Sequence, residues 1–447
     1  MGRVTYGYDD KYLAEINVGY NGSENFRRGK RFGFFPAFSL GWRITQEKFM
    51  ESTKDWLTNL KIRASYGQVG NDQYSQRFLY QAIWAQIPND YTFGNSNGVT
   101  GIYESQYANY DVTWEKANKY NAGLEFNLWD GKLSGVFDYF YERRKNILCA
   151  YQTMPQWLGV NMAAGNLGET KNSGIEIELH HRNRIGEHFN YTVDATFAHA
   201  KNEIISINEP MLKTAYQKQE GRSIGLTYGL IAEGFITSAD LANPNLPKSA
   251  YTDQLKVGDL KYKDMNNDGF IDDNDRTYFG YSDVPENTYT LSLGCDYKGI
   301  GFSVMFQGVD HVSRYYDAEA MYAFVNGGRV RALHLNRWNP AQTEAINLAT
   351  ATYPLLHYDS YGNHNQQTNS FFLQNGAFIR LKNIELYWDL PKKWISKLAM
   401  SQCRVYVNAN NLVTWDHLHD LDIDPESSGS NKYPIMKAIN FGLNVQF

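Results

Sequence analysis

The 447-residue sequence contains no run of about 18 consecutive apolar residues, which excludes a membrane-spanning helix. It opens without a basic stretch followed by an apolar stretch, so no signal peptide is predicted. Its three cysteines, Cys149, Cys295 and Cys403, are odd in number and far apart, which excludes a disulfide framework, a redox pair and a zinc site. Cys295 and Cys403 fall at strand positions predicted to be apolar, where a thiol is a small hydrophobic group.

Charge of one sign is not in excess either. The 43 Lys and Arg residues against 48 Asp and Glu residues give a net charge of −5, so no basic surface for nucleic acid is expected. There is no GxSxG, HExxH, P-loop or dinucleotide-binding fingerprint. Carboxylates are plentiful, but no pair is marked out as acid and base. The sequence therefore predicts a protein that is not an enzyme.

Aromatic residues, in contrast, are abundant: they make up 15% of the chain, with 33 Tyr against 24 Phe. Tyrosine suits positions where a ring meets both apolar matter and water, such as the aromatic girdles of a membrane barrel. A tyrosine-rich secreted sandwich that binds sugars is the alternative. A mean hydropathy of −0.53 does not argue against a barrel, because barrel strands expose only alternate residues to lipid and their loops are polar.

Residues 439–447, at the end of the chain, alternate apolar and polar side chains without a break. Ile439, Phe441, Leu443, Val445 and Phe447 share one strand face, while amides and a glycine share the other. An apolar outer face and an amide-lined inner face are typical of a transmembrane barrel strand. Because the alternation ends on an aromatic residue, we interpret it as the closing strand of a barrel, with Phe447 at the seam.

The same period of two recurs along the chain and predicts further strands. In each segment, apolar residues on one face oppose charged, amide or small residues on the other. A water-filled lumen accepts such polar residues and a dry core does not. The clearest segments are 12–21, 34–44, 60–67, 120–128, 175–180 and 190–197. Counted from residues 3–8 to the C-terminus, the pattern predicts about thirteen strands.

Short and long connections alternate between these strands. Short links at 129–132, 184–188 and 298–301 are predicted hairpins, and a longer link at 45–59 is predicted to contain a capping turn of helix. Long excursions lie between them at roughly 69–117, 148–172, 202–287 and 311–377. This is typical of an outer-membrane barrel with periplasmic turns and extracellular loops. The odd strand number predicts a portion of a barrel, because bacterial single-chain barrels have an even number.

Several separated blocks resemble the SusC/RagA-like TonB-dependent outer-membrane transporters of Bacteroidetes. The blocks occur in order and together extend over most of the chain. They are Tyr12-Leu13 with Tyr20-Asn-Gly-Ser23, Arg31 to Ile44 (RFGFFPAFSLGWRI), Leu60 to Asn71 (LKIRASYGQVGN), Gly168 to Ile177 (GETKNSGIEI), Asn375 to Ile384 (NGAFIRLKNI) and Arg404 to Leu412 (RVYVNANNL).

The resemblance implies an all-β fold, a transmembrane antiparallel β-barrel of about 22 strands with long extracellular loops and an N-terminal plug. Residues 1–447 are expected to be the C-terminal portion of such a receptor barrel, with the plug domain and the signal peptide absent. The implied function is import of an oligosaccharide or peptide across the cell outer membrane, together with a SusD-like surface lipoprotein and with the TonB complex acting through the plug. Outer-membrane lipid is a further implied partner, and Phe447 is expected to be a signal for barrel assembly.

One segment has the spacing of an EF-hand-type calcium loop. Gly269 stands at position 6, where such a loop turns sharply. Asp275 stands at position 12, where an EF-hand has Glu, so weaker or less bidentate chelation is expected. The predicted ligands are Asp264, Asn266, Asp268, Phe270 (through its carbonyl), Asp272 and Asp275. We expect a structural Ca²⁺ that rigidifies the 202–287 excursion, with a solvated acidic turn as the alternative.

Two other groups of residues are weaker candidates. The stretch Asp416-His-Leu-His-Asp420, followed by Asp422, Asp424 and Glu426, is predicted to be a solvated surface loop rather than a metal site. His180 and His181 lie on opposite faces of one strand and cannot bind one metal together. Aromatic residues in the long excursions are expected to pack loops together or against a partner, with stacking on sugars as the alternative; they are Trp84, Tyr103, Tyr110, Tyr315, Tyr316, Trp338, Tyr358 and Tyr361.

Three alternatives to a transporter barrel remain open at this point. A secreted, calcium-stabilised, β-rich glycan-binding protein and a glycoside hydrolase on a β scaffold would both stay soluble without detergent. The third alternative, a non-functional product of a truncated or split gene, is compatible with the barrel.

Overall fold

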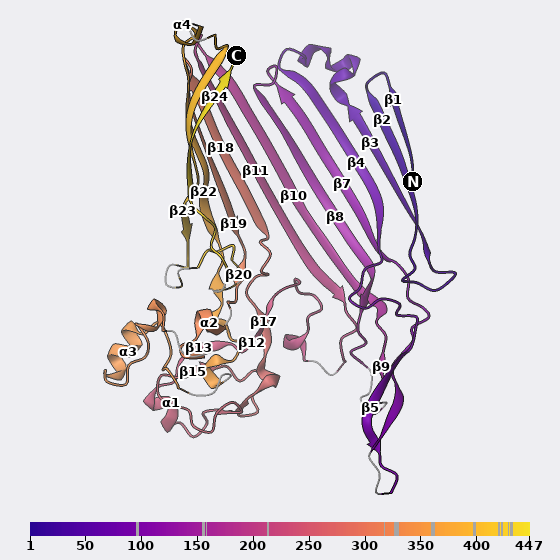
Figure 1. Cartoon of the computed structure of the whole chain (residues 1–447), viewed down its shortest axis with the longest axis vertical. Helices are drawn as coiled ribbons and strands as arrows, with labels where there is room; N and C mark the ends of the chain where they lie inside the picture. The colour runs from indigo at the N-terminus through magenta and orange to yellow at the C-terminus, as the bar shows by residue number, and fades with distance from the viewer. Residues whose placement is uncertain are drawn as a thin grey trace. The chain divides into compact units, whose positions relative to one another are not determined.

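A computed structural model of the chain describes residues 1–94, 98–153, 157, 159–211, 214–316, 318–325, 330–358, 363–396, 399–418, 421, 423–427, 429 and 432–447. The chain divides into two compact units. The first comprises Met1–His181, Ala198–Lys213 and Gln219–Arg222, and the second comprises Arg182–Phe197, Thr214–Lys218 and Ser223–Phe447. Each unit is built mainly from long strands (Figure 1). Among the described residues, no helix is long and apolar enough to cross a membrane.

Thirteen strands form one sheet, as the sequence predicts, and each is hydrogen-bonded to the sheet strand that follows it in the chain. The sheet strands are β1 (Gly2–Tyr8), β2 (Tyr12–Gly22), β3 (Phe32–Arg43), β4 (Leu57–Asn71), β7 (Glu115–Leu128), β8 (Leu133–Cys149), β10 (Gly165–Ile185), β11 (Phe189–Ser206), β18 (Asn287–Tyr297), β19 (Ile300–Asp310), β22 (Phe378–Asp389), β23 (Gln402–Asp416) and β24 (Ala438–Gln446). The order begins at β1 and ends at β24, so these two are its edge strands.

The predicted short links are confirmed. In the first unit, Trp129 and Asp130 turn the chain between β7 and β8 with positive φ angles of 50° and 55°. In the second unit, Lys298 and Gly299 form the turn between β18 and β19, with φ angles of 49° and 88°. The turn at Lys298 and Gly299 has two residues, both with positive φ, and this geometry matches the right-handed twist of the strands that it joins. The turn between β7 and β8 has four residues, 129–132, and Gly131 in it also has a positive φ, of 86°.

Short helices stand where two of the links are longer. Between β3 and β4, the predicted capping turn is a pair of 3-10 helices, η1 (Ile44–Gln46) and η2 (Lys48–Thr53). Between β22 and β23 lies α4 (Lys392–Ile395), whose Ile395 is buried. These turns close the ends of the strands on the side of the short links.

Two strands are longer than the sequence predicts. β10 already begins at Gly165, within the predicted excursion 148–172, and β11 continues to Ser206, past the predicted start of the next excursion at 202. Irregular pairing explains the first difference, because the register of β10 against β8 shifts on both sides of Gly168. Such β-bulges break the alternation of apolar and polar side chains by which a strand is read from sequence.

The first unit shows the two predicted faces. Where β4 pairs with β7, Ile62 lies opposite Leu124 and Lys61 lies opposite Glu125. Because successive side chains of a strand point to opposite sides, Ile62 and Leu124 belong to one face and Lys61 and Glu125 to the other. We call these the apolar face and the polar face.

The second unit repeats the alternation. Cys295 lies opposite Phe302, and Cys403 opposite Val445, so both thiols fall on its apolar face as predicted. In β24, Phe441 is 83% exposed, and Phe447, the residue after the strand end, is exposed to the same extent. A role for Phe447 in assembly stays a prediction.

A loop core gathers at the long-excursion end of the first unit. It contains buried Phe26, Phe35, Leu79, Trp114 and Leu148, together with Val112, Ala163 and Ala164. The ring of Trp114 packs against Phe26 and Phe35 at centroid distances of 5.5 and 5.2 Å. A separate three-stranded sheet extends the same excursions and consists of β5 (Ile83–Tyr91), β6 (Val99–Tyr107) and β9 (Asn161–Met162).

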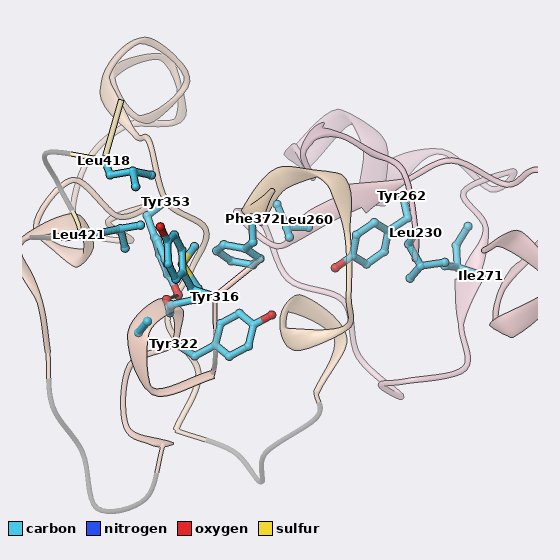
Figure 2. Close-up of a cluster of buried hydrophobic side chains, with 12 residues drawn as sticks. Leu230, Leu260, Tyr262, Ile271, Tyr316, Tyr322, Tyr353, Phe372, Leu418 and Leu421 are labelled. Atoms are coloured by element: carbon cyan, nitrogen blue, oxygen red, sulfur yellow. Dashed lines mark hydrogen bonds between the residues drawn. The ribbon is translucent and has the colours of Figure 1, made fainter. Parts of the chain in front are cut away.

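The excursions of the second unit fold into a larger loop core. Its elements are η4 (Ala215–Gln217), β12 (Thr227–Gly229), β13 (Ala232–Phe235), α1 (Ser238–Ala242), β14 (Lys248–Ser249), β15 (Leu260–Tyr262), β16 (Phe270–Ile271), η5 (Asp273–Asp275), β17 (Thr277–Phe279), β20 (Ser313–Arg314), α2 (Ala318–Met321), η7 (Ala332–His334), α3 (Glu344–Thr350), η8 (His364–Gln366), η9 (Ser370–Phe372) and β21 (Gln374–Asn375). Figure 2 shows its buried side chains, which are Leu230, Leu260, Tyr262, Ile271, Tyr316, Ala320, Met321, Tyr322, Tyr353, Phe372, Leu418 and Leu421.

Candidate functional site

The polar face of the first unit carries a group of charged side chains centred on Arg63. Its Nε donates to Glu125 Oε1 at 2.9 Å, and its Nη1 donates to Asn121 Oδ1 at 3.0 Å. Its Nη2 reaches Asp138 Oδ2 at 2.6 Å. Lys61 donates to the same Glu125 oxygen at 3.1 Å. The guanidinium fork therefore ties together side chains of β4, β7 and β8, and these charges neutralise one another locally.

Gly123 makes the longest of these contacts possible. It lies opposite Arg63 on one side and opposite Asp138 on the other, between the two charged residues. A Cβ atom at this position would stand 2.5 Å from Asp138 Oδ1 and 2.9 Å from Arg63 Cζ. The bare backbone of β7 thus leaves the space through which the Arg63 side chain reaches β8.

An open hollow of about 570 Å³ lies beside this group. Glu15, Lys61 and Arg63 border it from the polar face, whereas Leu40 and Ala64 border it as well and belong to the other face. Its lining therefore does not define a closed chamber for one ligand. The charged border suits transient contact with polar solutes.

The polar face of the second unit has a bidentate ion pair of its own. Arg404 Nε and Nη2 donate to the two carboxylate oxygens of Asp389 at 2.7 and 2.8 Å. The Arg404 guanidinium also lies 3.9 Å from the centroid of the Tyr387 ring. Both charged side chains are about a third exposed, at 33% and 31%, so they remain in contact with water.

Arg380, on the same face of the second unit, is completely buried. Its Nη2 donates to Asp424 at 2.7 Å, and its Nη1 donates to Glu426 at 2.5 Å. Its Nε donates to Thr414 Oγ1 at 3.0 Å, and the guanidinium stacks over the Phe378 ring at 5.1 Å. A buried cation is tolerated only when its donors are paired, and here every guanidinium nitrogen has a partner.

The ion pairs of Arg380 with Asp424 and Glu426 correct the interpretation of the acidic stretch that begins at Asp416. The described part of the stretch is not a solvated loop, because Leu418 and Leu421 are only 2% and 4% exposed and belong to the second loop core. The carboxylates of Asp424 and Glu426 form ion pairs with Arg380. Asp420 and Asp422 lie outside the described residues.

A buried polar hub at Asp259 joins two excursions of the second loop core. Its carboxylate accepts hydrogen bonds from His357 Nε2 at 2.5 Å, from Asn365 Nδ2 at 2.9 Å and from the Lys256 N–H at 2.8 Å. Burial acts to raise the pKa of Asp259, but these hydrogen bonds outweigh it and hold the pKa below its ordinary value. The charged form is therefore the stable one inside the core.

Two buried histidines nearby are held in the neutral form. His364 Nε2 lies 2.7 Å from the Leu260 carbonyl, and His334 Nε2 lies 3.2 Å from the Met321 carbonyl. Since a carbonyl only accepts, Nε2 carries the hydrogen in both rings, and each Nδ1 serves as an acceptor. His334 Nδ1 accepts the Arg331 N–H at 2.8 Å. Burial lowers the pKa of both histidines below the ordinary value.

The predicted calcium loop has the sharp turn at Gly269, whose φ is +83°. Ile271, two residues after Gly269, is 3% exposed and packs in the second loop core, which anchors the loop. Asp275 is fully buried, and its carboxylate accepts from the Met265 and Asp272 N–H groups at 2.8 and 2.9 Å. Burial raises the pKa of Asp275 above the ordinary value. The twelve-residue turn is thus closed by a hydrogen bond between its second residue, Met265, and its last, Asp275.

The other predicted side-chain ligands also accept N–H groups of the loop. Asp264 accepts from Asn267 and Gly269 at 2.6 and 2.9 Å, and Asp268 accepts from Phe270 at 2.8 Å. In the part of the chain that the structure describes, no three His, Cys, Asp or Glu side chains stand close enough together to form a metal site. The donor set suits a hard cation, but its carboxylates do not converge on one point here, so calcium binding stays a prediction.

The loop aromatics divide into two groups. Tyr316 and Trp338 are 3% and 2% exposed and Tyr315 packs against the second loop core, so for these three the packing interpretation is correct. The others, Trp84, Tyr103, Tyr110 and Tyr358, are between 41% and 89% exposed. Tyr361 lies outside the described residues. Stacking on a ligand therefore stays a prediction for the four exposed aromatics.

Sequence reasoning did not single out Arg380 or the Asp259 hub. Both depend on partners far along the chain: Arg380 meets Glu426, 46 residues away, and Asp259 meets His357, 98 residues away. No spacing rule connects such residues. The one signal in the sequence was an arginine within the alternating β22 segment, on the face that should be polar.

Comparison with known proteins gives a consistent result. A family model described as "TonB dependent receptor-like, beta-barrel" matches residues 1–412. The chain is 25% identical over 477 residues to TonB-dependent receptor P3 of Formosa agariphila, and the match takes in 100% of this chain and 45% of that protein. It is 23% identical over 455 residues to TonB-dependent receptor SusC of Bacteroides thetaiotaomicron, with 100% and 43% covered. The chain thus spans less than half the length of these relatives.

Solved structures show the same fold. The RagAB peptide transporter matches all of this chain and 47% of its own with a TM-score of 0.75 at 21% identity. The RagAB peptide importer in its open-open state matches all of this chain and 46% of its own with a TM-score of 0.76 at 23% identity.

Proposed function

The chain belongs to the TonB-dependent receptor-like β-barrel family of the outer membrane and is SusC/RagA-like, and from this premise we propose that it is part of an importer for an oligosaccharide or a peptide. The observation that carries the proposal is the two-faced sheet. Its apolar face suits lipid, and its polar face presents paired charges such as Arg63 and Asp138 to a water-filled lumen. The family is one of receptors and transporters, and we propose no enzymatic role.

The family places the protein in the membrane and so favours a transporter over a secreted glycan-binding protein. Two supports bear on the substrate class. Two solved structures with the same fold are titled a peptide transporter and a peptide importer, which favours a peptide. Exposed aromatic side chains in the excursions of the first unit, such as Trp84 and Tyr103, offer stacking surfaces that suit sugar rings as well.

The test is growth and uptake with the gene deleted. Cells that lack it should lose growth on either oligosaccharides or peptides as sole carbon source, and the intact gene should restore growth. Uptake of the same labelled substrate should also stop when TonB is disrupted. Unchanged growth on both classes in the deletion strain would remove the proposal, and uptake that persists without TonB would remove the energy coupling.

We also propose a SusD-like surface lipoprotein as partner, together with the TonB complex through a plug domain. The β5–β6 ribbon supports the first partner, because it exposes large apolar side chains on both faces, among them Trp84, Ile87, Ile102 and Tyr103. Only the two-residue strand β9 extends this ribbon, and an uncovered ribbon of two long strands is marginally stable in water, so a covering partner would stabilise it. Cross-linking from a photoreactive residue at Trp84 in intact cells should capture one surface lipoprotein, and capture of no protein would count against this partner.

For the loop at Asp264–Asp275 we propose a structural Ca²⁺. Its support is the set of oxygen donors spaced two residues apart around Gly269, together with the anchoring of Ile271 in the second loop core. Binding would require Asp264 and Asp268 to turn part of their hydrogen bonding from the loop N–H groups to the ion. The role would be to stiffen the excursion and not to take part in chemistry.

A further inference from the structure

Basic side chains gather at one end of the apolar face of the first unit. On this face of β7, the residues run from Lys116 through Asn118 and Tyr120 to Ala122 and Leu124. In the antiparallel strand β8, Lys145 lies opposite Lys116, Arg143 opposite Asn118, and Tyr141 opposite Tyr120. On both strands, therefore, a lysine lies nearest the long excursions. An amide or a second cation comes next, then a tyrosine, and then further residues of the apolar face.

The tyrosines mark the level where lipid gives way to water. Tyr120 lies between Tyr66 and Tyr141, at ring centroid distances of 5.1 and 6.2 Å, so three strands contribute one aromatic row. Trp129 stands nine residues further along, in the turn at the other end of β7. At ~3.3 Å per residue and a tilt of ~40°, this separation is ~23 Å in height, close to the apolar band of an outer-membrane barrel.

Two of the cations above this row are unpaired. Lys116 and Lys145 lie directly opposite each other in the register, an arrangement that destabilises a sheet when the charges are alike. Within the described residues, no carboxylate lies within 4.0 Å of either lysine nitrogen. Arg143, by comparison, forms an ion pair with Glu169, and Lys171 forms one with Glu203 at 2.8 Å.

The polar face at the same height is different. Lys119 is paired with Glu142 at 3.2 Å, and Arg144 is paired with Glu115 and Glu142 at 3.0 Å each. On the polar face these cations are compensated by carboxylates, whereas on the apolar face Lys116 and Lys145 have no carboxylate partner among the described residues. An anion from the membrane is the partner that this arrangement lacks.

A hollow of the right kind lies between these residues. It has a volume of about 390 Å³ and is lined by Asn118, Tyr120, Tyr141, Arg143 and Lys145. Asn118 Oδ1 accepts hydrogen bonds from Tyr66 and Gln68 at 3.1 and 3.0 Å, which leaves its amide hydrogens for a ligand. Cations, amide donors and tyrosine rings together suit a phosphate attached to an apolar tail.

We propose that this basic cluster, defined by Lys116, Asn118, Arg143 and Lys145, binds the phosphate-bearing head group of an outer-leaflet lipid. The proposal rests on the outer-membrane location and goes beyond the import function. The cluster lies at the long-excursion end of β7 and β8, which is the extracellular side of a barrel of this family. The lipid phosphate neutralises the Lys116–Lys145 pair, and its acyl chains cover the tyrosine row below.

The experiment compares two double variants of the full-length protein extracted from its native membrane. Lys116→Gln/Lys145→Gln removes the unpaired cations. The control, Lys119→Gln/Lys54→Gln, removes the same charge at an exposed position of the polar face and at an exposed residue near the short links. Lipid A retained after detergent washing is measured by mass spectrometry. The cluster variant should retain about tenfold less than the wild type, and the control should stay within about twofold of it. Equal retention by the two variants would overturn the proposal.

Two further arms identify the chemistry that is bound. Phosphorylated lipid A should bind the purified protein about tenfold more tightly than the same lipid after phosphatase treatment, and the difference should shrink at high salt. Inorganic phosphate alone should bind more weakly than the phosphorylated lipid. Equal affinity for the two lipids would show that apolar contact suffices, and equal affinity for free phosphate would show that no lipid is required; each result contradicts the proposal. Heat-modifiable migration on gels confirms that every variant is folded.

Discussion

Arg63 and Asp138 meet across an intervening strand: Nη2 of the arginine on β4 lies 2.6 Å from Oδ2 of the aspartate on β8, above Gly123 of β7. Ordinary cross-strand pairs join adjacent strands, and this one spans two strand spacings, about 10 Å. Only a long, forked side chain over a residue without a side chain can do so. The contact therefore couples three strands of the polar face through a single guanidinium.

Gly123→Ala should weaken this coupling. The added methyl group would stand 2.5 Å from Asp138 Oδ1 and 2.9 Å from Arg63 Cζ, which forces both side chains to move. We expect a loss of about 1–3 kcal/mol in the free energy of unfolding, measured by denaturant titration of the refolded barrel. Gly67→Ala is the matched control on the same face, because its nearest contact would be the Ala37 methyl at 3.4 Å. Equal losses in the two variants would contradict the role given to Gly123.

Much of the sheet was readable from the sequence, because the environment of a strand residue repeats every two positions. Ile62 and Lys61 reveal their faces by type alone, and the turns at Asp130 and Gly299 by composition. The start of β10 at Gly165 was not readable, since bulges interrupt the period there. Compositional rules also cannot identify partners, which depend on the path of the chain between them.

The second loop core was not predicted for the same reason. Its residues come from three excursions, and none of the excursions has a period that separates its buried side chains from exposed ones. The acidic stretch after Asp416 looked solvated because it is rich in charge. In the structure, Asp424 and Glu426 form ion pairs with the buried Arg380, and Leu418 and Leu421 are buried in the second loop core.

Arg380→Met should release the segment that follows β23. The substitution leaves Asp424 and Glu426 without a cation beside an apolar side chain, although both can turn toward water because they are 15% and 34% exposed. We expect a loss of about 3 kcal/mol in the free energy of unfolding, at the lower end for breaking a buried ion pair. Hydrogen exchange at the Leu418 and Leu421 amides should become faster by a comparable factor.

Arg404→Met is the control for this prediction. It breaks the bidentate pair with Asp389 on the same face, but both side chains there are about a third exposed. Water compensates for such a loss, so the cost should stay near 1 kcal/mol or less. If Arg380→Met costs no more than Arg404→Met, burial of the guanidinium does not stabilise the segment.

Calcium should raise the midpoint of thermal unfolding of the second loop core if the Asp264–Asp275 loop binds it. At a free concentration about one hundred times the dissociation constant, the gain is about 2.7 kcal/mol. Asp264→Asn/Asp268→Asn should abolish the shift, while Asp253→Asn, at an exposed position outside the loop, should keep it. An unchanged midpoint in the wild type between calcium and chelator would leave the loop as a turn held by its own hydrogen bonds.

Acidification should destabilise the second loop core between about pH 6.5 and the lowered pKa values of His334 and His364. Both rings are buried and neutral in the folded state, with pKa values that burial lowers, whereas in the unfolded chain they take up a proton near pH 6.5. The unfolded state therefore binds more protons in this window, and the free energy of unfolding falls as the pH falls. The slope is at most about 1.4 kcal/mol per pH unit for each histidine. Because the pKa of Asp259 is lowered in the folded state, its contribution to the free energy of unfolding is lost only when the pH falls below about 4.

His334→Gln separates this effect from general acid damage. A glutamine cannot titrate, so the pH slope of the unfolding midpoint should be reduced by the share of one histidine, even if the variant is less stable at pH 8. His334 is the sharper choice because its Nδ1 accepts the Arg331 N–H, and a proton added there would set two donors against each other. His188→Gln, at a ring about half exposed in the turn before β11, should leave the slope unchanged. If the wild type shows the same midpoint at pH 5 and pH 7, the neutral histidines do not control the stability of this core.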